Sequence, residues 1–193
     1  MHIEQNLIDQ CIAKNQRAQQ ALFEACFPFL IKICRSYSRD DQEAMSYLNG
    51  GFYKILKGLK KKPDEIPFQS WAKRIVINSI IDHYRKYKKH RDSHRAVENL
   101  SIISNNNIKF DPYHVDQIFE AEDIIAMIRS LPKMTSLVFT LYAVGDFEYT
   151  EIAKKLDITE STVRWHVSKA RRELIKRIEK ISDKKKLIHE QAG

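Results

Sequence analysis

Apolar residues recur at intervals of three and four along most of the chain, a spacing that gathers them on one face of an α-helix. One such run is Leu22, Phe23, Cys26, Phe29, Leu30 and Ile33. The chain has only five glycines and no stretch of regular apolar and polar alternation, which would indicate a strand. The pattern therefore predicts an all-α protein.

The helical spacing is lost between about Asp92 and Val115, where three consecutive asparagines and an Asp-Pro pair indicate a loop. We therefore predict two small helical domains joined by a flexible linker. A single bundle with one long loop is the alternative. The predicted parts are a domain of residues 1–91, a linker of residues 92–115, a domain of residues 116–182 and a tail of residues 183–193.

The net charge differs between the predicted domains and the segment that connects them. The 193 residues carry 33 basic and 25 acidic side chains, a formal net charge of +8. Residues 1–92 and 123–193 carry net charges of +7 and +4, whereas residues 93–122 carry −3. Two basic modules on one tether suit two places on a single polyanion, although a merely soluble basic protein has the same composition. The lysines Lys184–Lys186 belong either to a solvated end or to a phosphate contact.

Several classes of protein are disfavoured by the sequence. The odd number of cysteines, without C-x-x-C spacing or an early signal peptide, indicates a reducing interior, so we expect a cytoplasmic location and buried thiols. No apolar stretch is long enough to cross a membrane, and no glycine-rich nucleotide loop is present. The combination of His83, His90, His94 and Cys34 has no metal-site spacing. We expect no enzyme activity, cofactor, metal, small-molecule substrate or membrane insertion.

The segment from Tyr149 to Leu174 has the layout of a helix-turn-helix. Ile152, Ala153 and Leu156 form a short apolar stripe, and Asp157 tolerates the left-handed backbone of a turn. Thr159 is a suitable N-cap, so a second helix is expected to begin near Glu160. A helix, a turn of about four residues and another helix are typical of DNA-binding proteins.

The second helix has separate apolar and polar faces. At about 100° per residue, Val163, Val167, Ala170 and Leu174 form one buried seam. Cations opposite the seam can neutralise phosphates, and short serines let the helix approach base edges. Trp165 either contacts DNA or packs against a neighbouring helix. The predicted DNA contacts are Ser161, Thr162, Arg164, Trp165, Ser168, Lys169 and Arg172.

A second candidate segment, PFQSWAKRIVINSIIDHYRKYKK, covers residues 67–89 and interleaves aromatic with basic residues. Aromatic rings stack on unpaired bases while cations follow the phosphates, which is how single strands are held. Asn78 and Asp82 lie one helical turn apart, so both can face the same base or adjacent bases. Trp71 and Tyr84 are core residues in the alternative interpretation. The predicted single-strand contacts are Phe68, Trp71, Arg74, Asn78, Asp82, Tyr84 and Arg85.

These two segments together resemble bacterial RNA polymerase sigma factors of the extracytoplasmic function (ECF) group, in the sigma-70 family. Residues 131–174 resemble the promoter-reading domain of that group, and residues 67–89 are similar to its strand-melting segment. The matching residues of the first are Leu131, Pro132, Tyr149, Glu151, Ile152, Ala153, Thr162, Val163, Arg164, Ala170 and Arg171. Those of the second are Phe68, Trp71, Arg74, Ile75, Asn78, Asp82, Tyr84 and Arg85.

The resemblance implies a function and partners. The first domain would bind core RNA polymerase and melt the minus-ten element, with Asn78 and Asp82 reading flipped bases, while the second would read the minus-thirty-five element as duplex promoter DNA. It also implies an anti-sigma factor as a partner. The alternative is a helix-turn-helix regulator that binds duplex DNA as a dimer without acting in initiation. A third possibility is a pure interaction protein that sequesters polymerase or a regulator.

The stretch EAMSYLNGGFYKIL, residues 43–56, departs from the family pattern for polymerase docking. Ser46, Asn49 and Gly50 stand where the family has an acid, an amide and an acid. Two glycines inside a helix weaken it by roughly 1 kcal/mol each relative to alanine. Either they permit close packing, or the polymerase contact is weaker or differently drawn. The predicted docking residues are Asn49, Phe52 and Ile55.

Overall fold

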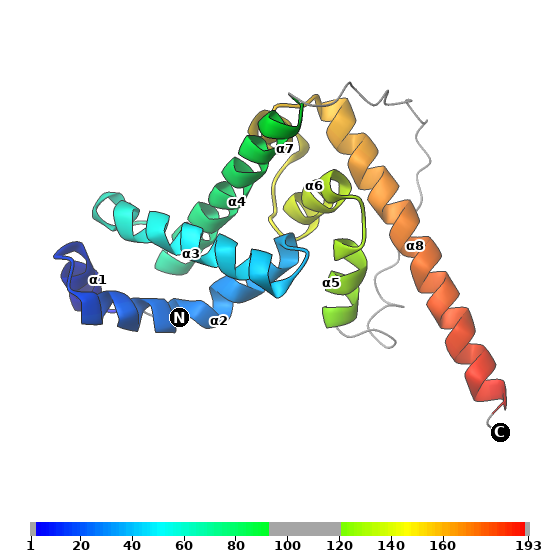
Figure 1. Ribbon diagram of the computed structural model, residues 1–193, viewed down its shortest axis with the longest axis horizontal. Coiled ribbons are helices and arrows are strands. Elements are labelled where there is room, and N and C mark those ends of the chain that lie inside the picture. The colour runs from blue at the N-terminus through cyan, green and yellow to red at the C-terminus, as the bar shows by residue number, and fades with distance from the viewer. Residues whose placement is uncertain (1–2, 93–120, 192–193) are drawn as a thin grey trace. The chain divides into compact units, whose positions relative to one another are not determined.

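The computed structural model describes residues 3–92 and 121–191 of the chain. Within these two ranges the chain forms eight α-helices, one short 3-10 helix and no strand. The α-helices are labelled in Figure 1. The prediction of an all-α protein is therefore confirmed.

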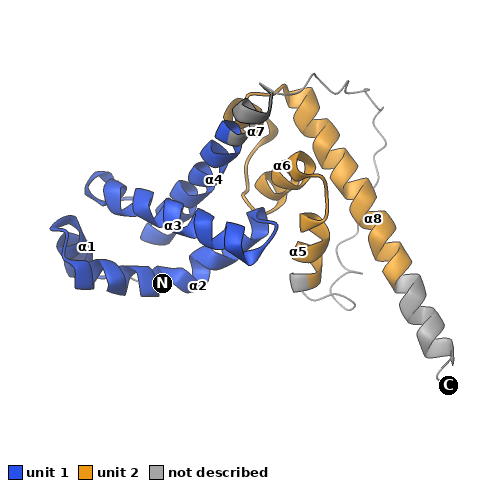
Figure 2. Ribbon diagram, in the orientation of Figure 1, with its two compact units in different colours: residues 1–97 blue, residues 98–193 orange. Residues whose placement is uncertain are grey.

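The chain separates into two compact units, residues 1–97 and residues 98–193 (Figure 2). The first unit contains α1 (Gln5–Ile12), α2 (Gln16–Tyr37), α3 (Asp41–Gly58), η1 (Leu59–Lys61) and α4 (Phe68–Asp92). The second contains α5 (Ala121–Arg129), α6 (Lys133–Ala143), α7 (Tyr149–Leu156) and α8 (Glu160–Gln191). Except for Asp92, the predicted linker lies outside the described residues. The backbone of α8 continues to Gln191, so most of the predicted tail is helical.

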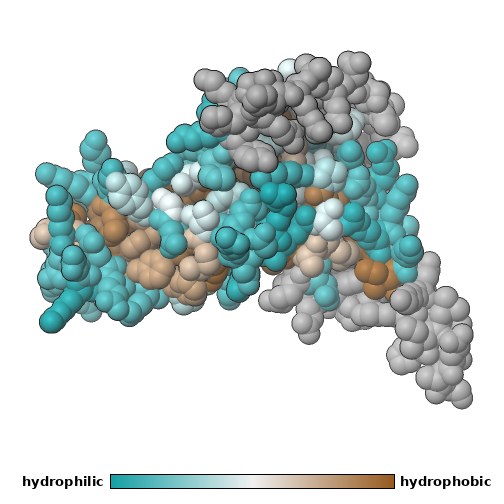
Figure 3. All heavy atoms as spheres, in the orientation of Figure 1, coloured by the Kyte–Doolittle hydropathy of each residue, from teal (hydrophilic) through white to brown (hydrophobic). Residues whose placement is uncertain are grey.

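In the first unit α3 packs between α2 and α4, and α1 packs on α2. Leu22, Leu48, Ile55 and Val76 are completely buried at the centre of this core. Each buried side chain of this size stabilises the fold by roughly 1.5–3 kcal/mol. On the face drawn in Figure 3, apolar side chains also gather over α2, and the half-buried Phe23, Phe27, Phe29 and Ile33 pack against the same core.

The three cysteines are part of this core. Cys11, Cys26 and Cys34 are free thiols with at most 3% of their surface exposed. Burial raises the pKa of both Cys26 and Cys34 to about 12, so both remain protonated at neutral pH. The prediction that they act as small buried hydrophobes is confirmed.

In the second unit α8 packs against α5, α6 and α7. The predicted seam of α8 is buried, with Val163, Val167, Ala170 and Leu174 exposed by 0%, 1%, 0% and 7%. The last two meet Met127, Ile128 and Leu131, from α5 and the turn that follows it. The seam fixes which face of α8 remains accessible.

Candidate nucleic-acid interface

The turn between α7 and α8 has the geometry that the sequence predicts. Asp157 adopts the left-handed conformation, with φ 54° and ψ 55°, and the following amide of Ile158 donates to the carbonyl of Ala153 at 3.1 Å. The amide of Thr162 donates to Thr159 Oγ1 at 3.2 Å, which makes Thr159 the N-cap of α8. The prediction that α8 begins at Glu160 is confirmed.

A feature at the start of α7 was not predicted. The backbone amide of Glu148 donates a hydrogen bond to the side-chain carboxylate of Glu151 at 3.2 Å, in a capping box that begins α7. The sequence signal was present, because a glutamate three residues after an N-cap is the usual second half of such a box.

The polar face of α8 is accessible. Ser161, Arg164 and Ser168 are exposed, and Thr162, Trp165, Lys169 and Arg172 are half-buried. Arg164 also pairs with Glu160, with 3.1 Å between Nε and Oε1, yet its side chain keeps 60% of its surface exposed. All seven predicted contact residues are therefore at least partly exposed on α8, whose apolar seam faces the core.

Trp165 has neighbours on its own helix. The ammonium of Lys169 lies 4.8 Å from the centre of the Trp165 ring, and the ring of His166 meets it edge-on with 4.8 Å between centroids. The rest of the half-buried indole is accessible. These contacts lie within α8 itself, so they support neither packing on a neighbouring helix nor contact with DNA, and the contact with DNA stays a prediction.

His166 is a residue of this helix that the sequence analysis missed. Its side chain is 7% exposed, and Nδ1 is hydrogen-bonded to Thr135 Oγ1 of α6 at 3.0 Å. Burial, with a smaller contribution from Lys169, lowers the pKa of His166 to about 4, so the ring is neutral at pH 7. Its position beside the seam residues Val163 and Val167 was the signal that could have found it.

The aromatic and basic segment in the first unit lies on α4. Arg74, Asp82 and Arg85 are exposed, and Trp71, Asn78 and Tyr84 are half-buried. Asp82 is paired with Lys54 of α3, with 2.8 Å between Nζ and Oδ2. The side chains of Tyr87, Lys88 and Lys89 are outside the described part of the chain.

Phe68 requires a correction. Only 8% of its surface is exposed, because its ring lies in the core of the first unit and packs against Trp71 with 5.8 Å between ring centroids. A ring so covered offers no face for a base to stack on. We therefore leave Phe68 out of the single-strand contacts and keep the other six residues.

The three predicted docking residues on α3 differ in how exposed they are. Asn49 is exposed, whereas Phe52 and Ile55 are 8% and 0% exposed and belong to the core. They follow the apolar stripe that packs α3 against its neighbours, so their fit to the family pattern reflects packing rather than an accessible docking surface. This corrects the prediction for Phe52 and Ile55.

The two glycines of α3 have different surroundings. A Cβ on Gly51 would lie 2.8 Å from Cγ2 and 3.3 Å from Cα of Val76 in α4, so Gly51 permits the close approach of the two helices. A Cβ on Gly50 would meet nothing within 4 Å. Close packing therefore explains Gly51 but not Gly50, which lies on the exposed face with Asn49 and Ser46.

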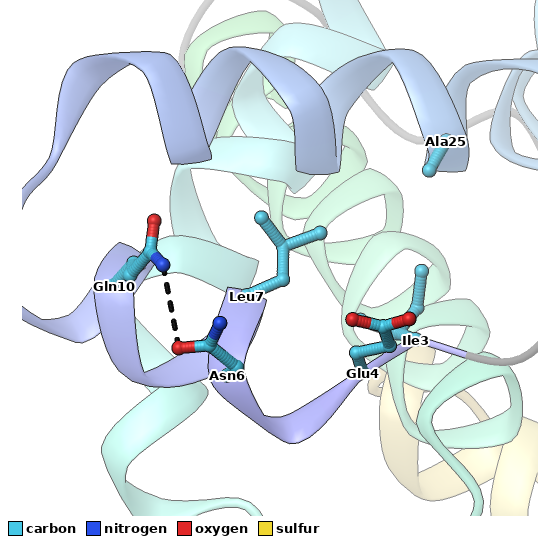
Figure 4. A pocket seen from close by; sticks show the side chains of 6 residues that line it. All are labelled: Ile3, Glu4, Asn6, Leu7, Gln10 and Ala25. Carbon is cyan, nitrogen blue, oxygen red and sulfur yellow. Dashed lines mark hydrogen bonds between the residues drawn. The ribbon is translucent and has the colours of Figure 1, made fainter.

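The described residues contain few other features of a binding site. A pocket of about 310 Å³ lies between α1 and α2 and is lined by Ile3, Glu4, Asn6, Leu7, Gln10 and Ala25 (Figure 4). It has no basic or aromatic side chain that would suit nucleic acid. Residues 3–92 and 121–191 hold no group of three potential metal ligands, and none of their helices is long and apolar enough to cross a membrane.

The fold and the accessible face of α8 define a helical DNA-binding protein with a helix-turn-helix in its second unit. The family model described as Sigma-70 region 2 matches residues 22–90, and that described as Sigma-70, region 4 matches residues 121–174. Together these matches cover more than half of the chain, which belongs to the sigma-70 family. It is therefore a promoter-directing sigma factor, whose partners are core RNA polymerase and promoter DNA, and not a dimeric helix-turn-helix regulator.

Two solved structures are similar to the chain. The sigma factor RpoE in complex with the anti-sigma factor NepR, from Bartonella quintana, is 16% identical; the match covers 83% of this chain and 96% of that chain, with a TM-score of 0.48. CnrH in complex with the cytosolic domain of CnrY is 20% identical; the match covers 90% of this chain and 95% of that chain, with a TM-score of 0.44. No match was found among curated proteins.

Proposed function

We propose that this chain is an ECF-group sigma factor whose two units divide the promoter between them. Residues 1–91 dock on core polymerase and open the minus-ten element, residues 92–115 connect the units, and residues 116–182 read the minus-thirty-five element as duplex. The observation that carries the proposal is the accessible polar face of α8, which a left-handed turn and an N-cap place directly after α7. A cytoplasmic location belongs to the proposal, because bacterial polymerase works there.

For the minus-thirty-five element, we assign base-edge contacts to the centre of the polar face and phosphate contacts to its cations. Ser161 and Ser168 are exposed and short, so they allow α8 to lie deep in the major groove. Lys169 and Arg172 supply positive charge beside them. The remaining members of the set are Thr162, Arg164 and Trp165.

For the minus-ten element, the proposal rests on α4. Asn78 and Asp82 lie one turn apart, and exposed Arg74 and Arg85 are available for phosphates. Asp82 is paired with Lys54 in the absence of DNA, but an exposed pair contributes about 1 kcal/mol at most, so a base can replace Lys54 at small cost. Trp71 and Tyr84 offer partly exposed rings.

For polymerase docking, the part of the predicted site that is accessible is the surface of α3 around Asn49 and Gly50. This surface is polar and uncharged, which supports a polymerase contact made by other residues than the acidic ones of the family pattern. An anti-sigma factor that covers the DNA- or polymerase-binding surfaces is the third partner in the proposal.

The central test is transcription by purified core polymerase on a pool of genomic fragments from the host, with and without this protein. Adding the protein should produce transcripts with new, discrete start sites that share two upstream elements. Binding to duplex DNA as a dimer, with no new start sites, would contradict the proposal.

Replacing Asn78 by alanine tests the role of α4 in strand opening. At a promoter found in this way, Asn78→Ala should reduce the permanganate reactivity of thymines in the minus-ten element about tenfold or more, because a base reader is lost. Duplex binding upstream should be unchanged. Ser70→Ala, at an exposed position of the same helix, is the control. Equal reactivity in Asn78→Ala and wild type would remove Asn78 from the proposed site.

A further inference from the structure

Four side chains in the second unit form a series in which two neighbouring rings lie between two cations. The guanidinium of Arg164 lies 5.0 Å from the centre of the Tyr149 ring, and the rings of Tyr149 and Tyr142 lie 5.0 Å apart at 47°. The guanidinium of Arg171 lies 5.4 Å from the centre of the Tyr142 ring and donates a hydrogen bond to Tyr142 Oη at 3.3 Å. We call these four residues the Arg–Tyr series.

The series joins α8 to the junction of α6 and α7. Tyr142 is the next-to-last residue of α6, and Tyr149 is the first residue of α7. Arg164 and Arg171 are seven residues apart on α8, which places them on the same side of the helix and about 10 Å apart along its axis. Two rings from the junction therefore lie against two cations on one flank of α8.

The flank differs in position from the face assigned to base edges. At about 100° per residue, both arginines lie roughly a quarter-turn from the buried seam, whereas Ser161 and Ser168 lie close to the opposite side. A helix that places its serines in the major groove turns such a flank toward the sugar-phosphate backbone. Arginine suits phosphate because its planar fork of donors can bind two oxygens at once.

The rings restrict the arginines without neutralising them, and Arg164 in addition forms an exposed ion pair with Glu160. Burial, followed by the neighbouring Tyr142, raises the pKa of Tyr149, so this phenol stays uncharged at neutral pH. Fixing a free arginine side chain by a contact costs conformational entropy. If a ring already holds the guanidinium in the unbound protein, most of that entropy is lost on folding, and binding to DNA loses little more.

We infer that Tyr142 and Tyr149 are positioning residues that hold Arg171 and Arg164 in place for phosphates of duplex DNA. The inference rests on the proposed function of α8 and adds to it two residues that touch neither base nor phosphate. The opposing interpretation is that the four side chains only hold α8 against α6 and α7.

The test is a double-mutant cycle on Arg171 and Tyr142 in the full-length protein. Binding to a short mixed-sequence duplex is followed by fluorescence anisotropy over a range of salt concentrations. Arg171→Ala should reduce the slope of log affinity against log salt by about 1, because one phosphate contact is lost. Tyr142→Leu should weaken binding about threefold to tenfold in the wild-type background and have no further effect when Arg171 is already alanine.

Two further variants support the cycle. Tyr142→Phe keeps the ring and removes only the hydrogen bond, so it should retain most of the affinity. If Tyr142→Leu does not fold, the cycle is run on the second pair, with Tyr149→Leu and Arg164→Ala. Tyr53→Leu is the matched control, because Tyr53 also lies under a cation, with Lys57 Nζ 4.5 Å from its ring centre, but on α3. It should change neither the affinity nor the salt slope.

The possible results distinguish failure of the inference from failure of the proposed sigma-factor function. If Tyr142→Leu loses the same affinity for duplex in both backgrounds, the tyrosine is purely structural and the inference is overturned. An unchanged salt slope for Arg171→Ala, or a wild type that does not bind duplex at all, would also overturn it. Transcription by the wild-type protein is scored separately. New start sites together with an additive cycle leave the sigma function intact and remove only the inference.

Discussion

His166 occupies a position on α8 that favours a neutral side chain. It is buried beside the seam and hydrogen-bonded to Thr135 of α6, and its pKa is lowered to about 4 from the ordinary value of 6.5. Between these two pH values the unfolded chain binds a proton that the folded chain does not. The folded state is therefore destabilised as the pH falls from about 6.5 to 4.

We expect the second unit to lose up to about 3 kcal/mol of stability over this range from His166 alone. The chain has two tryptophans, so in a Trp71→Phe background the fluorescence of Trp165 reports the unfolding of the second unit. Urea unfolding at pH 7, 6, 5 and 4 measures the change. His166→Gln should flatten the pH dependence, because glutamine does not titrate.

The control for this measurement is His83→Gln, since His83 lies exposed on α4 in the other unit. It should leave the pH dependence of Trp165 unfolding as it is in the Trp71→Phe parent. The same slope in His166→Gln and its parent would show that His166 is not the titrating group.

At the scale of a helix, α3 contains two adjacent glycines whose roles differ. Gly50 is exposed with open space around it, whereas Gly51 is buried against Val76. Alanine is favoured over glycine in a helix interior because it loses less backbone freedom on folding. The same substitution should therefore have opposite effects at the two positions.

Gly50→Ala should raise the free energy of unfolding of the first unit by about 0.5–1 kcal/mol. Gly51→Ala should lower it by roughly 1–3 kcal/mol, because the new methyl overlaps a stiff β-branched side chain and the α4 backbone behind it. Each variant is the control for the other. Urea unfolding followed by Trp71 in a Trp165→Phe background gives both values, and a stabilised Gly51→Ala would contradict the packing argument.

The boundary between α7 and α8 could be predicted because its signals are local. The left-handed Asp157, the N-cap Thr159 and the start of α8 follow from a few consecutive residues. The seam of α8 followed from its period. In α3 and α4 the family resemblance selected Phe52, Ile55 and Phe68 as contact residues, and all three are buried in the core. Similarity to a functional motif does not reveal which of its residues the core covers.

For the whole molecule, the proposal requires both units to act on one promoter through one chain. The connection keeps the second unit at a high local concentration once the first has bound, which can raise affinity roughly 10²-fold to 10⁴-fold without any new contact. Cutting the connection should remove this gain while leaving each unit folded.

A protease site inserted at Asn106 makes this testable. Cleavage should reduce promoter-specific initiation by about 10²-fold at limiting protein, and high concentrations of both fragments should restore part of it. The uncleaved protein with the same insertion is the control. Full activity after cleavage, with fragments that separate in size-exclusion chromatography, would show that the covalent connection is not needed.

The sequence by itself determined the helical class, the division into two basic parts and the helix-turn-helix, since these depend on local period, local turns and composition. It also carried the family resemblance, which rests on matching residues in two segments. Only the tertiary structure showed that Lys54 pairs with Asp82 and that His166 is hydrogen-bonded to Thr135. It also showed that Gly51 packs closely against Val76, and that the guanidinium groups of Arg164 and Arg171 lie over the rings of Tyr149 and Tyr142. Each of these contacts joins residues from different helices. Their partners are chosen by how the helices pack, and no spacing along the chain specifies that packing.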